Sequence, residues 1–336
     1  MILRLVNSAI LVLTLMLLLT GGYGIIWRLQ GWVYEAHRIA AWALIALIPL
    51  KIGISARSLG RGVKPNFDRG LLPVISLLLS GMALFVIVLG LMWAWRLGPE
   101  VLWLRETVIS WHWILALVLF PPLLLHTWRR WPRPKRAEFL DRRTALKALG
   151  LGGLGLLGWQ LSAALARARQ HEDHVRAISG SRLNGYLTSN DFPVTNSAGD
   201  GRQVVDLANW ELAVSGAAAR PLTFRYDEVL ALSTCSKLAT LDCTVGWYSV
   251  QRWRGVPLAQ LLELVGAAED FTLVTMRAVE GYAHNVTPAE AQQVLLATHV
   301  GGQPLDHVHG FPLRAVVPSR RGWFWVKWLA EVEIVA

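Results

Sequence analysis

Four long apolar stretches occupy most of the first 131 residues. Residues 5–27 and 71–95 contain no charged side chain, and residues 107–128 contain none if histidine is counted as neutral. Residues 39–56 contain a single charge, on Lys51. A helix that crosses the roughly 30 Å hydrocarbon core of a bilayer needs about 20 mainly apolar residues. The helices of a soluble protein would show charged positions on an exposed face. The pattern therefore predicts an N-terminal, all-α bundle of four transmembrane helices.

Basic residues are concentrated in two of the segments that flank these stretches. Residues 57–69 hold four basic side chains against one acidic, and residues 129–147 hold eight against two. The other two loops are nearly balanced. Loops rich in Lys and Arg stay in the cytoplasm, so the N-terminus is expected there too. Much of the net charge of +10 is thus a topology signal, and we expect a membrane rather than a nucleic acid as partner.

A fifth apolar segment, residues 148–166, is rich in glycine and alanine. The run Asp141-Arg142-Arg143-Thr144 before it resembles a twin-arginine export signal, which directs folded domains across the membrane. A chance Arg-Arg pair in a basic loop is the alternative. The segment is expected either to be cleaved near Ala166 or to remain as an anchor helix. We therefore divide the chain into a membrane domain (1–131), a basic linker with this segment (132–169) and an exported domain (170–336).

Beyond residue 170 the apolar runs shorten to the length of strands. Strands are predicted over 210–215, 238–245, 271–279 and 313–318. Short helices that begin at a proline are predicted over 257–265 and 288–298. Mixed short strands and helices in about 165 residues are typical of an α+β domain.

Three histidines, His37, His112 and His126, lie in the predicted membrane helices. Ionisable groups at that depth are costly and are functional candidates by default. His37 and His112 open two helices that run in the same direction, so both are expected near the outer face. His126 follows His112 by 14 residues, which places it on the same helix face about 21 Å deeper. Lys51 follows His37 by the same interval.

This arrangement resembles the four-helix b-type cytochromes that exchange electrons with quinones. The resemblance implies haem b bound by His37 and His112. A second haem would lie between His126 and Lys51. The alternatives are polar packing between helices for the histidines, and for Lys51 a side chain that reaches the cytoplasmic headgroups.

The chain has two cysteines, Cys235 and Cys243. Cys243 ends a predicted strand and is followed by Gly246-Trp247, which is compatible with a soft metal ligand, a nucleophile or a buried thiol. Cys235 is expected to be structural, although a disulfide between the two is possible outside the cytoplasm. A second block runs from His309 to Trp328 and combines cations, glycines and tryptophans. Such clusters on turns suit phosphate recognition, and a solvated basic face is the alternative.

Together the two blocks resemble the molybdopterin domain of the sulfite oxidase superfamily over roughly residues 180–336, closest to the exported bacterial branch that includes methionine-sulfoxide reductases. The resemblance implies molybdenum bound by the Cys243 thiolate and by a pterin dithiolene. It also implies a set of pterin-binding residues: Tyr186, Thr188, Ser189, Asn190, His309, Arg314, Trp325, Val326 and Lys327. Four further basic residues are candidates for orienting substrate: Arg252, Arg254, Arg320 and Arg321.

The sequence thus predicts a membrane-anchored molybdenum oxidoreductase. Its catalytic domain would lie outside the cytoplasmic membrane, transfer oxygen atoms to or from a small substrate and exchange electrons with the quinone pool through haem b. The alternative is a membrane electron carrier that contains only haem and whose exported domain binds no cofactor.

Overall fold

The computed structural model describes residues 2–59, 67–99, 101–130, 142–168, 179–195 and 204–336. The chain forms two compact units. One comprises the helical residues up to Ser179, apart from the short segment Ile25–Arg28. The other comprises Gly180–Ala336 together with that segment.

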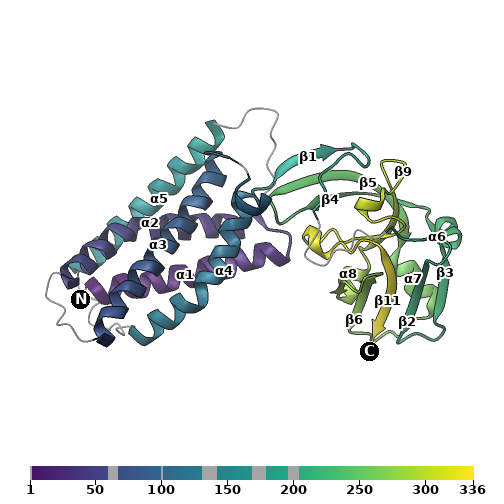
Figure 1. The fold of residues 1–336 in the computed structure, drawn as a ribbon, viewed down its shortest axis with the longest axis horizontal. Helices are drawn as coiled ribbons and strands as arrows, with labels where there is room; N and C mark the ends of the chain where they lie inside the picture. Colours follow the sequence, from purple (N-terminus) through teal and green to yellow (C-terminus); the bar gives the residue numbers. More distant parts are fainter. Residues whose placement is uncertain (1, 60–66, 100, 131–141, 169–178, 196–203) are drawn as a thin grey trace. The chain divides into compact units, whose positions relative to one another are not determined.

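The helical unit contains five long helices (Figure 1): α1 Ile2–Ile26, α2 Gly31–Leu59, α3 Phe67–Trp95, α4 Val108–Arg130 and α5 Arg142–Ala168. A short 3-10 helix, Trp103–Arg105, precedes α4. The first four helices are long and apolar enough to cross a membrane, which confirms the four helices predicted. The apolar part of α5, Leu149–Leu165, is shorter. The twin-arginine-like run begins at Asp141, outside the described residues, and of Arg142 and Arg143 only the helical backbone is described.

Helices α3 and α4 pack against each other, and α2 packs against α5. Leu89 and Trp93 of α3 form a small buried cluster with Val108 of α4. Large apolar side chains such as Leu77 and Leu78 are exposed on the outside of α3. An exposed apolar surface of this kind is what a lipid-facing helix presents, because hydrocarbon rather than water is its solvent.

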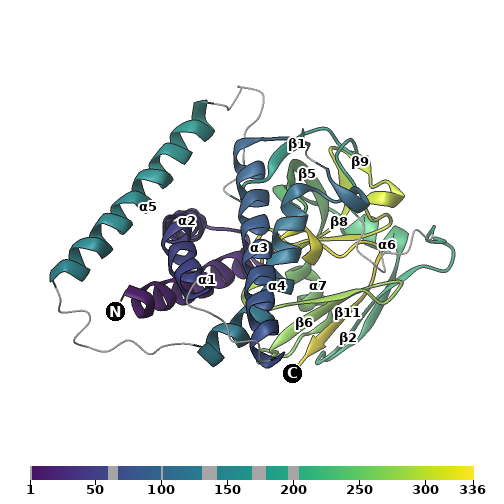
Figure 2. The same cartoon turned by 60° about the vertical axis from the view of Figure 1, so that its left-hand side comes forward.

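The C-terminal unit is built on two sheets. The first has the order β1-β5-β8-β10, with β4 paired to β5 and β9 paired to β8. Its strands are β1 Arg182–Tyr186, β4 Cys235–Asp242, β5 Trp247–Pro257, β8 Leu295–Val300, β9 Gln303–Pro304 and β10 Arg314–Val316. The second has the order β3-β2-β11-β6-β7, and Figure 2 shows β2, β11 and β6 side by side. Its strands are β2 Glu211–Gly216, β3 Leu222–Arg225, β6 Leu273–Ala278, β7 Ala283–Val286 and β11 Leu329–Val335.

One hydrophobic core joins the two sheets. Trp253 and Leu296 from the first sheet are fully buried in the same cluster as Leu212 and Met276 from the second. Three α-helices lie between the strands along the chain: α6 Tyr226–Leu232, α7 Leu258–Val265 and α8 Pro288–Ala291. Two 3-10 helices, η3 His307–His309 and η4 Gly322–Phe324, lie in the last third of the unit. The mixture of strands and short helices confirms the predicted α+β class.

The predicted helix over 288–298 is wrong in its second half. The helix ends at Ala291, and Leu295–Val300 form β8 in the interior of the first sheet. Four of the six residues of β8 are consecutive and fully buried (Leu295, Leu296, Ala297 and Thr298). A continuous apolar run of this length fits a buried strand as well as a buried helix, and periodicity does not separate the two.

A disulfide between the two cysteines is also excluded. Both thiols are free. Cys235 begins β4 and Cys243 follows its last residue, and a strand of this length holds its two ends roughly 25 Å apart at about 3.3 Å per residue.

The pairing of β5 with β8, which has an irregularity between Arg254 and Gly255, depends on a residue without a side chain. A Cβ atom at Gly255 would lie 1.9 Å from the Leu296 carbonyl oxygen. Gly255→Ala should therefore lower the apparent melting temperature of the detergent-solubilised chain by about 5 °C or more, since overpacking against a backbone atom costs about 3 kcal/mol or more. Gly153→Ala is the control, because Gly153 has an ordinary helical backbone and its Cβ would meet nothing within 4 Å. Equal melting temperatures for both variants in tryptophan-fluorescence scans would contradict the expected role of Gly255.

Candidate active site

Cys243 lies in the turn of the β4–β5 hairpin. Its backbone N–H donates to the carbonyl of Trp247 (2.8 Å), and Gly246 donates to the carbonyl of Cys243 (3.2 Å). Gly246 has φ of 98°, a conformation that glycine adopts without steric cost. The Cys243 side chain is buried, and burial raises the pKa of its thiol, although the hydrogen bond with Thr195 and the charge of Arg321 act in the opposite direction. The thiol therefore lies inside the unit and needs a cation to be stabilised as a thiolate.

A buried ion pair between Asp242 and Arg321 fixes the backbone of this turn. Arg321 Nη1 lies 3.0 Å from Asp242 Oδ2, and Arg321 Nη2 donates to the carbonyl of Cys243 at 2.9 Å. Ser181 Oγ donates to the other carboxylate oxygen of Asp242 at 2.7 Å. Arg321 was a candidate for orienting substrate, but its side chain is only 6% exposed and binds the protein itself. Its role here is to fix the backbone around Cys243.

The segment Phe192–Thr195 brings together the two sequence blocks. The Cys243 thiol lies 3.5 Å from Thr195 Oγ1, which also accepts a hydrogen bond from the Trp247 indole at 3.1 Å. Lys327 Nζ donates to the Thr195 carbonyl at 3.3 Å. Sequence reasoning missed Thr195. The only signal was its position just after the Asp191-Phe192-Pro193 stretch, and nothing in the sequence places it against the cysteine.

His309 ends η3 and is 3% exposed. Its Nε2 lies 3.1 Å from the Phe192 carbonyl, and its ring contacts the Phe192 ring at a tilt of 44°, with centroids 4.0 Å apart. Burial, with a contribution from the charge of Arg314, lowers the pKa of His309 to about 4. His309 is therefore neutral at physiological pH and can donate from one ring nitrogen while it accepts at the other.

Arg314 and the Trp325–Lys327 run lie next to His309 in the structure. Arg314 Nη1 donates to the His309 carbonyl at 2.9 Å, and its guanidinium lies 5.6 Å from the Trp253 ring centroid and 5.9 Å from that of Trp325. The Val326 carbonyl accepts from the Ala315 N–H. Lys327 Nζ lies 4.7 Å from the Trp328 ring centroid. Cations with aromatic neighbours and little water are well suited to hold an anionic group.

The segment Tyr186–Asn190 forms hydrogen bonds with the backbone of the residues that lead into η3. Ser189 Oγ donates to the Val300 carbonyl (2.9 Å), and Asn190 Nδ2 donates to the Pro304 carbonyl (2.9 Å). Asn190 Oδ1 accepts from the N–H of Asp306, the residue before η3. Thr188 Oγ1 donates to the Asp191 carbonyl and accepts from Gln251, and Tyr186 is exposed. In this structure the segment ties β1 to the loop that carries His309.

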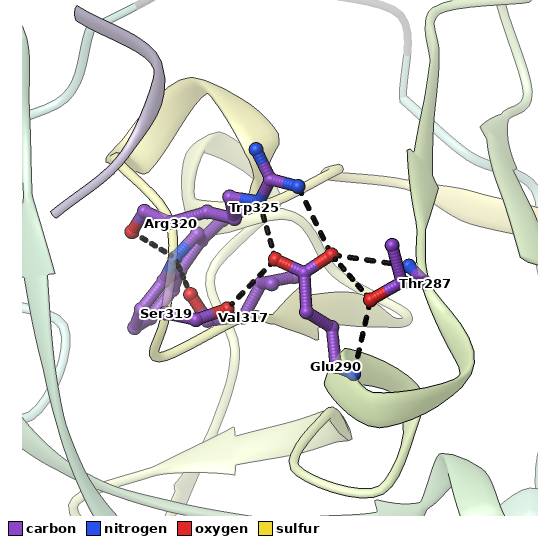
Figure 3. Close-up of polar contacts among 6 residues, drawn as sticks. All are labelled: Thr287, Glu290, Val317, Ser319, Arg320 and Trp325. Atoms are coloured by element: carbon purple, nitrogen blue, oxygen red, sulfur yellow. Dashed lines mark hydrogen bonds and ion pairs between the residues drawn. The ribbon is translucent and has the colours of Figure 1, made fainter. Parts of the chain in front are cut away.

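Figure 3 shows how Glu290 holds the turn before Arg321. The Glu290 carboxylate pairs with the Arg320 guanidinium through both oxygens and accepts from Ser319 Oγ at 3.2 Å. It also accepts from the N–H and the hydroxyl of Thr287, at 3.0 and 3.1 Å. Arg320 was another candidate for orienting substrate, and the structure instead pairs it with Glu290. Arg252 and Arg254 are exposed, and Arg254 lies beside His299 (Nη2 to Nε2, 3.1 Å).

In the helical unit the rings of His37 and His112 meet, with centroids 6.4 Å apart. His37 Nδ1 lies 2.9 Å from Thr20 Oγ1, and His112 Nδ1 lies 2.8 Å from the Val86 carbonyl. Two imidazoles that share one metal at about 2 Å from each nitrogen would have centroids roughly 6 Å apart. Glycines provide room, because a Cβ at Gly90 would lie 2.9 Å from the His112 ring. The two rings therefore fit a metal held between their Nε2 atoms, while the hydrogen bonds at Nδ1 fix the orientation of each ring.

Lys51 and His126 are the remaining candidate ligands in the helical unit. Lys51 Nζ donates to Asn7 Oδ1 of α1 at 2.8 Å. His126 lies on α4 near its C-terminal end.

Comparison with known proteins identifies the C-terminal unit. Residues 199–336 match the family model described as the oxidoreductase molybdopterin binding domain. The uncharacterized oxidoreductase YuiH of Bacillus subtilis is 32% identical over 145 residues, which cover 42% of this chain and 73% of that protein. This chain belongs to the family of molybdopterin-binding oxidoreductases.

Two other relatives carry more specific names. A putative protein-methionine-sulfoxide reductase subunit, YedZ1 of Azospira oryzae, is 28% identical over 209 residues, covering 56% of this chain and 77% of that protein. The protein-methionine-sulfoxide reductase catalytic subunit MsrP of Xanthomonas campestris is 30% identical over 151 residues, covering 40% of this chain and 47% of MsrP. The family is of the sulfite oxidase and MsrP type, and its members are oxidoreductases.

Buried polar atoms in the C-terminal unit fit the cofactor that the family implies. Among the described residues, His309 Nδ1, Arg321 Nε and Gln251 Oε1 are buried and make no hydrogen bond, as are both ring nitrogens of His307. Each buried polar atom without a partner costs about 1–3 kcal/mol. A polar, anionic ligand such as molybdopterin would supply hydrogen-bond partners for these atoms. The buried Cys243 thiol, as a thiolate, would be a soft sulfur ligand for the metal.

The Glu290–Arg320 pair gives a test of this architecture. Burial alone raises the pKa of Glu290, but the hydrogen bonds from Arg320 and Thr287 outweigh it, and the pKa lies below the usual value. The stabilisation that this ion pair gives to the folded chain is therefore fully present above the pKa of an unfolded glutamate, about 4.3. It is lost as the pH falls through the lower pKa of Glu290 in the folded chain. Glu290→Gln should lower stability by about 1–3 kcal/mol at pH 7, and this loss should shrink as the pH falls below about 4.

Glu228→Gln is the matched control. Glu228 occupies the same position in the first turn of α6 and accepts from the Arg225 N–H at 2.7 Å, but it is exposed. Thermal scans at pH 7 and pH 3 should show a pH-dependent loss for Glu290→Gln and little change for Glu228→Gln. Equal losses in the two variants would show that the buried pair does not hold the turn.

Proposed function

We propose that this chain is a membrane-anchored molybdenum oxidoreductase that reduces sulfoxides outside the cytoplasmic membrane with electrons from the quinone pool. The observation that carries the proposal is the convergence of Cys243, His309 and Lys327 on the segment Phe192–Thr195. The relatives named as methionine-sulfoxide reductase subunits support a sulfoxide as substrate. Lys and Arg in the loops support an extracytoplasmic catalytic domain.

Cys243 would bind molybdenum through its thiolate, and His309, Arg314 and Lys327 would hold the pterin and its phosphate. Tyr186, Thr188, Ser189 and Asn190 would line the same cofactor from the β1 side, and Trp325 and Val326 from the η4 side. When bound, the molybdenum centre supplies two-electron oxygen-atom transfer. The chain keeps the Cys243 thiol away from water, holds its backbone through Arg321 and keeps His309 neutral. Family membership argues against the alternative in which the exported domain binds no cofactor.

His37 and His112 would bind one haem b. Their ring spacing and their fixed Nδ1 partners support this assignment. When bound, the haem supplies one-electron transfer between the quinone and the catalytic unit. The match to YedZ1 extends beyond the C-terminal unit, because 56% of this chain is more than that unit can supply. A second haem at His126 has less support, since Lys51 is hydrogen-bonded to Asn7.

Cys243→Ser should remove turnover of a sulfoxide substrate by the purified chain in detergent, since a serine hydroxyl is a poor ligand for a soft metal. Cys235→Ser, which changes the other thiol, should leave turnover within about twofold. Metal analysis should find close to one molybdenum per chain in the wild type. Normal turnover in Cys243→Ser would disprove the role of this thiol.

His112→Ala should abolish the b-type absorption bands, because a haem with one ligand removed is lost or changes its spin state. His126→Ala is the control and should leave the bands intact if one haem is bound. Halved absorption in His126→Ala would instead reveal a second haem. In stopped-flow experiments a sulfoxide should reoxidise the reduced haem. If sulfite instead reduces the haem, the reaction runs in the opposite direction from the one proposed.

A further inference from the structure

Helix α5 is divided into two faces of different chemistry. Gly155, Gly158, Trp159 and Ser162 recur at the spacing of one helix face, and all four contact other helices of the unit. Leu154, Leu157 and Leu161 follow a second face and are 61%, 55% and 62% exposed. A helix that merely guided export and was then removed would not need a face built to fit its neighbours.

The contacts with α2 are close because glycines permit them. A Cβ on Gly155 would lie 3.1 Å from Ala43 Cα, and a Cβ on Gly158 would lie 2.6 Å from the Trp42 ring. Small residues let helix backbones approach closely, which is the main source of helix association in lipid. The apolar segment from Leu149 to Leu165 is rich in glycine and is shorter than the four helices that are long enough to cross a membrane. Packing against α2 therefore supplies stability that its hydrophobicity alone does not.

Two side-chain hydrogen bonds reinforce this packing. The Trp159 indole N–H donates to Glu35 Oε2 at 2.7 Å, and Glu35 is also paired with Arg38 at 2.9 Å. The Trp95 indole of α3 lies 3.2 Å from Ser162 Oγ, and Ser162 is 5% exposed. Polar bonds between helices are valuable in hydrocarbon because water does not compete for them.

The face of α2 that meets α5 lies opposite His37. Glu35 and Trp42 are seven residues apart and share a face, whereas His37 is about 200° round the helix from Glu35. Helix α5 thus holds α2 from one side, and on the other side His37 meets His112 on α4. Any rotation of α2 that moved His37 would break the contacts of Glu35, Trp42 and Ala43 with α5.

We infer that α5 remains in the mature protein as a fifth helix of the membrane unit, and that Trp159, through Glu35, positions the turn of α2 that carries His37. Retention of α5 stands independently of the cofactors. The positioning role of Trp159 rests on the proposed haem at His37 and His112.

The first test is the size and location of the chain. A C-terminally tagged full-length protein should stay in the membrane fraction at its full mass of 37.3 kDa. A tagged soluble fragment of about half that mass would show that the segment is cleaved and would overturn the inference.

The second test uses a pair of glycine variants. Gly158→Leu should lower the melting temperature of the solubilised chain and speed the loss of haem several-fold, because the new side chain would occupy the space of Trp42. Gly153→Leu is the matched control, since Gly153 is exposed and a Cβ there would meet nothing within 4 Å. Identical behaviour of the two variants would show that the α2–α5 contact does not matter.

The third test isolates the positioning role of Trp159. Trp159→Phe keeps the aromatic bulk and removes the hydrogen bond to Glu35. It should shift the electron paramagnetic resonance signal and the reduction potential of the haem, while the protein remains at full mass in the membrane. An unchanged signal would disprove the positioning role. A wild-type protein without haem bands would instead disprove the proposed haem, and the mass and melting tests of α5 would still stand.

Discussion

The catalytic unit depends on the buried ion pair between Asp242 and Arg321. The pair joins the end of β4 to the loop after β10, and Arg321 also holds the carbonyl of Cys243. Burying two charges is costly, and such a pair is rarely a net source of stability. Removing one partner, however, leaves a buried charge and costs about 3–5 kcal/mol. The pair therefore favours one backbone arrangement around Cys243, which the proposed role of this thiol as a metal ligand requires.

The rest of the site is organised around that fixed point. Phe192–Thr195 reaches the Cys243 thiol at one end and the His309 ring at the other, and Glu290 fixes the turn that leads into Arg321. Several buried polar atoms nearby have no hydrogen bond within the described residues. Hydrogen bonds thus fix the backbone around the thiol, and the buried polar atoms are available as partners for a polar cofactor.

The helical unit follows different rules because its solvent is hydrocarbon. Its outer faces are apolar, and the polar contacts between its helices include those of Thr20 with His37, Val86 with His112, and Glu35 with Trp159. Each supports a histidine or the helix that carries it. The small-residue face of α5 belongs to the same system.

Much of this protein follows from local patterns along its sequence. The four apolar stretches determine the membrane helices, because backbone polar groups in lipid must be satisfied within a helix. The alternation of short strands and helices determines the α+β class. Cys243 is a candidate because few residue types bind a soft metal, whereas His309 is a candidate through the resemblance of its block to the sulfite oxidase superfamily.

Only the tertiary structure decided which groups meet. Thr195 reaches Cys243 across 48 residues, Arg321 reaches Asp242 across 79, and Trp159 reaches Glu35 across 124. A local pattern carries no information about such distant partners. For the same reason the buried run Leu295–Val300 reads as helix or strand with equal ease, until the neighbouring strands β5 and β10 supply its hydrogen bonds. Sequence patterns report how each segment meets its solvent, whereas the site consists of contacts between segments, which only the folded chain creates.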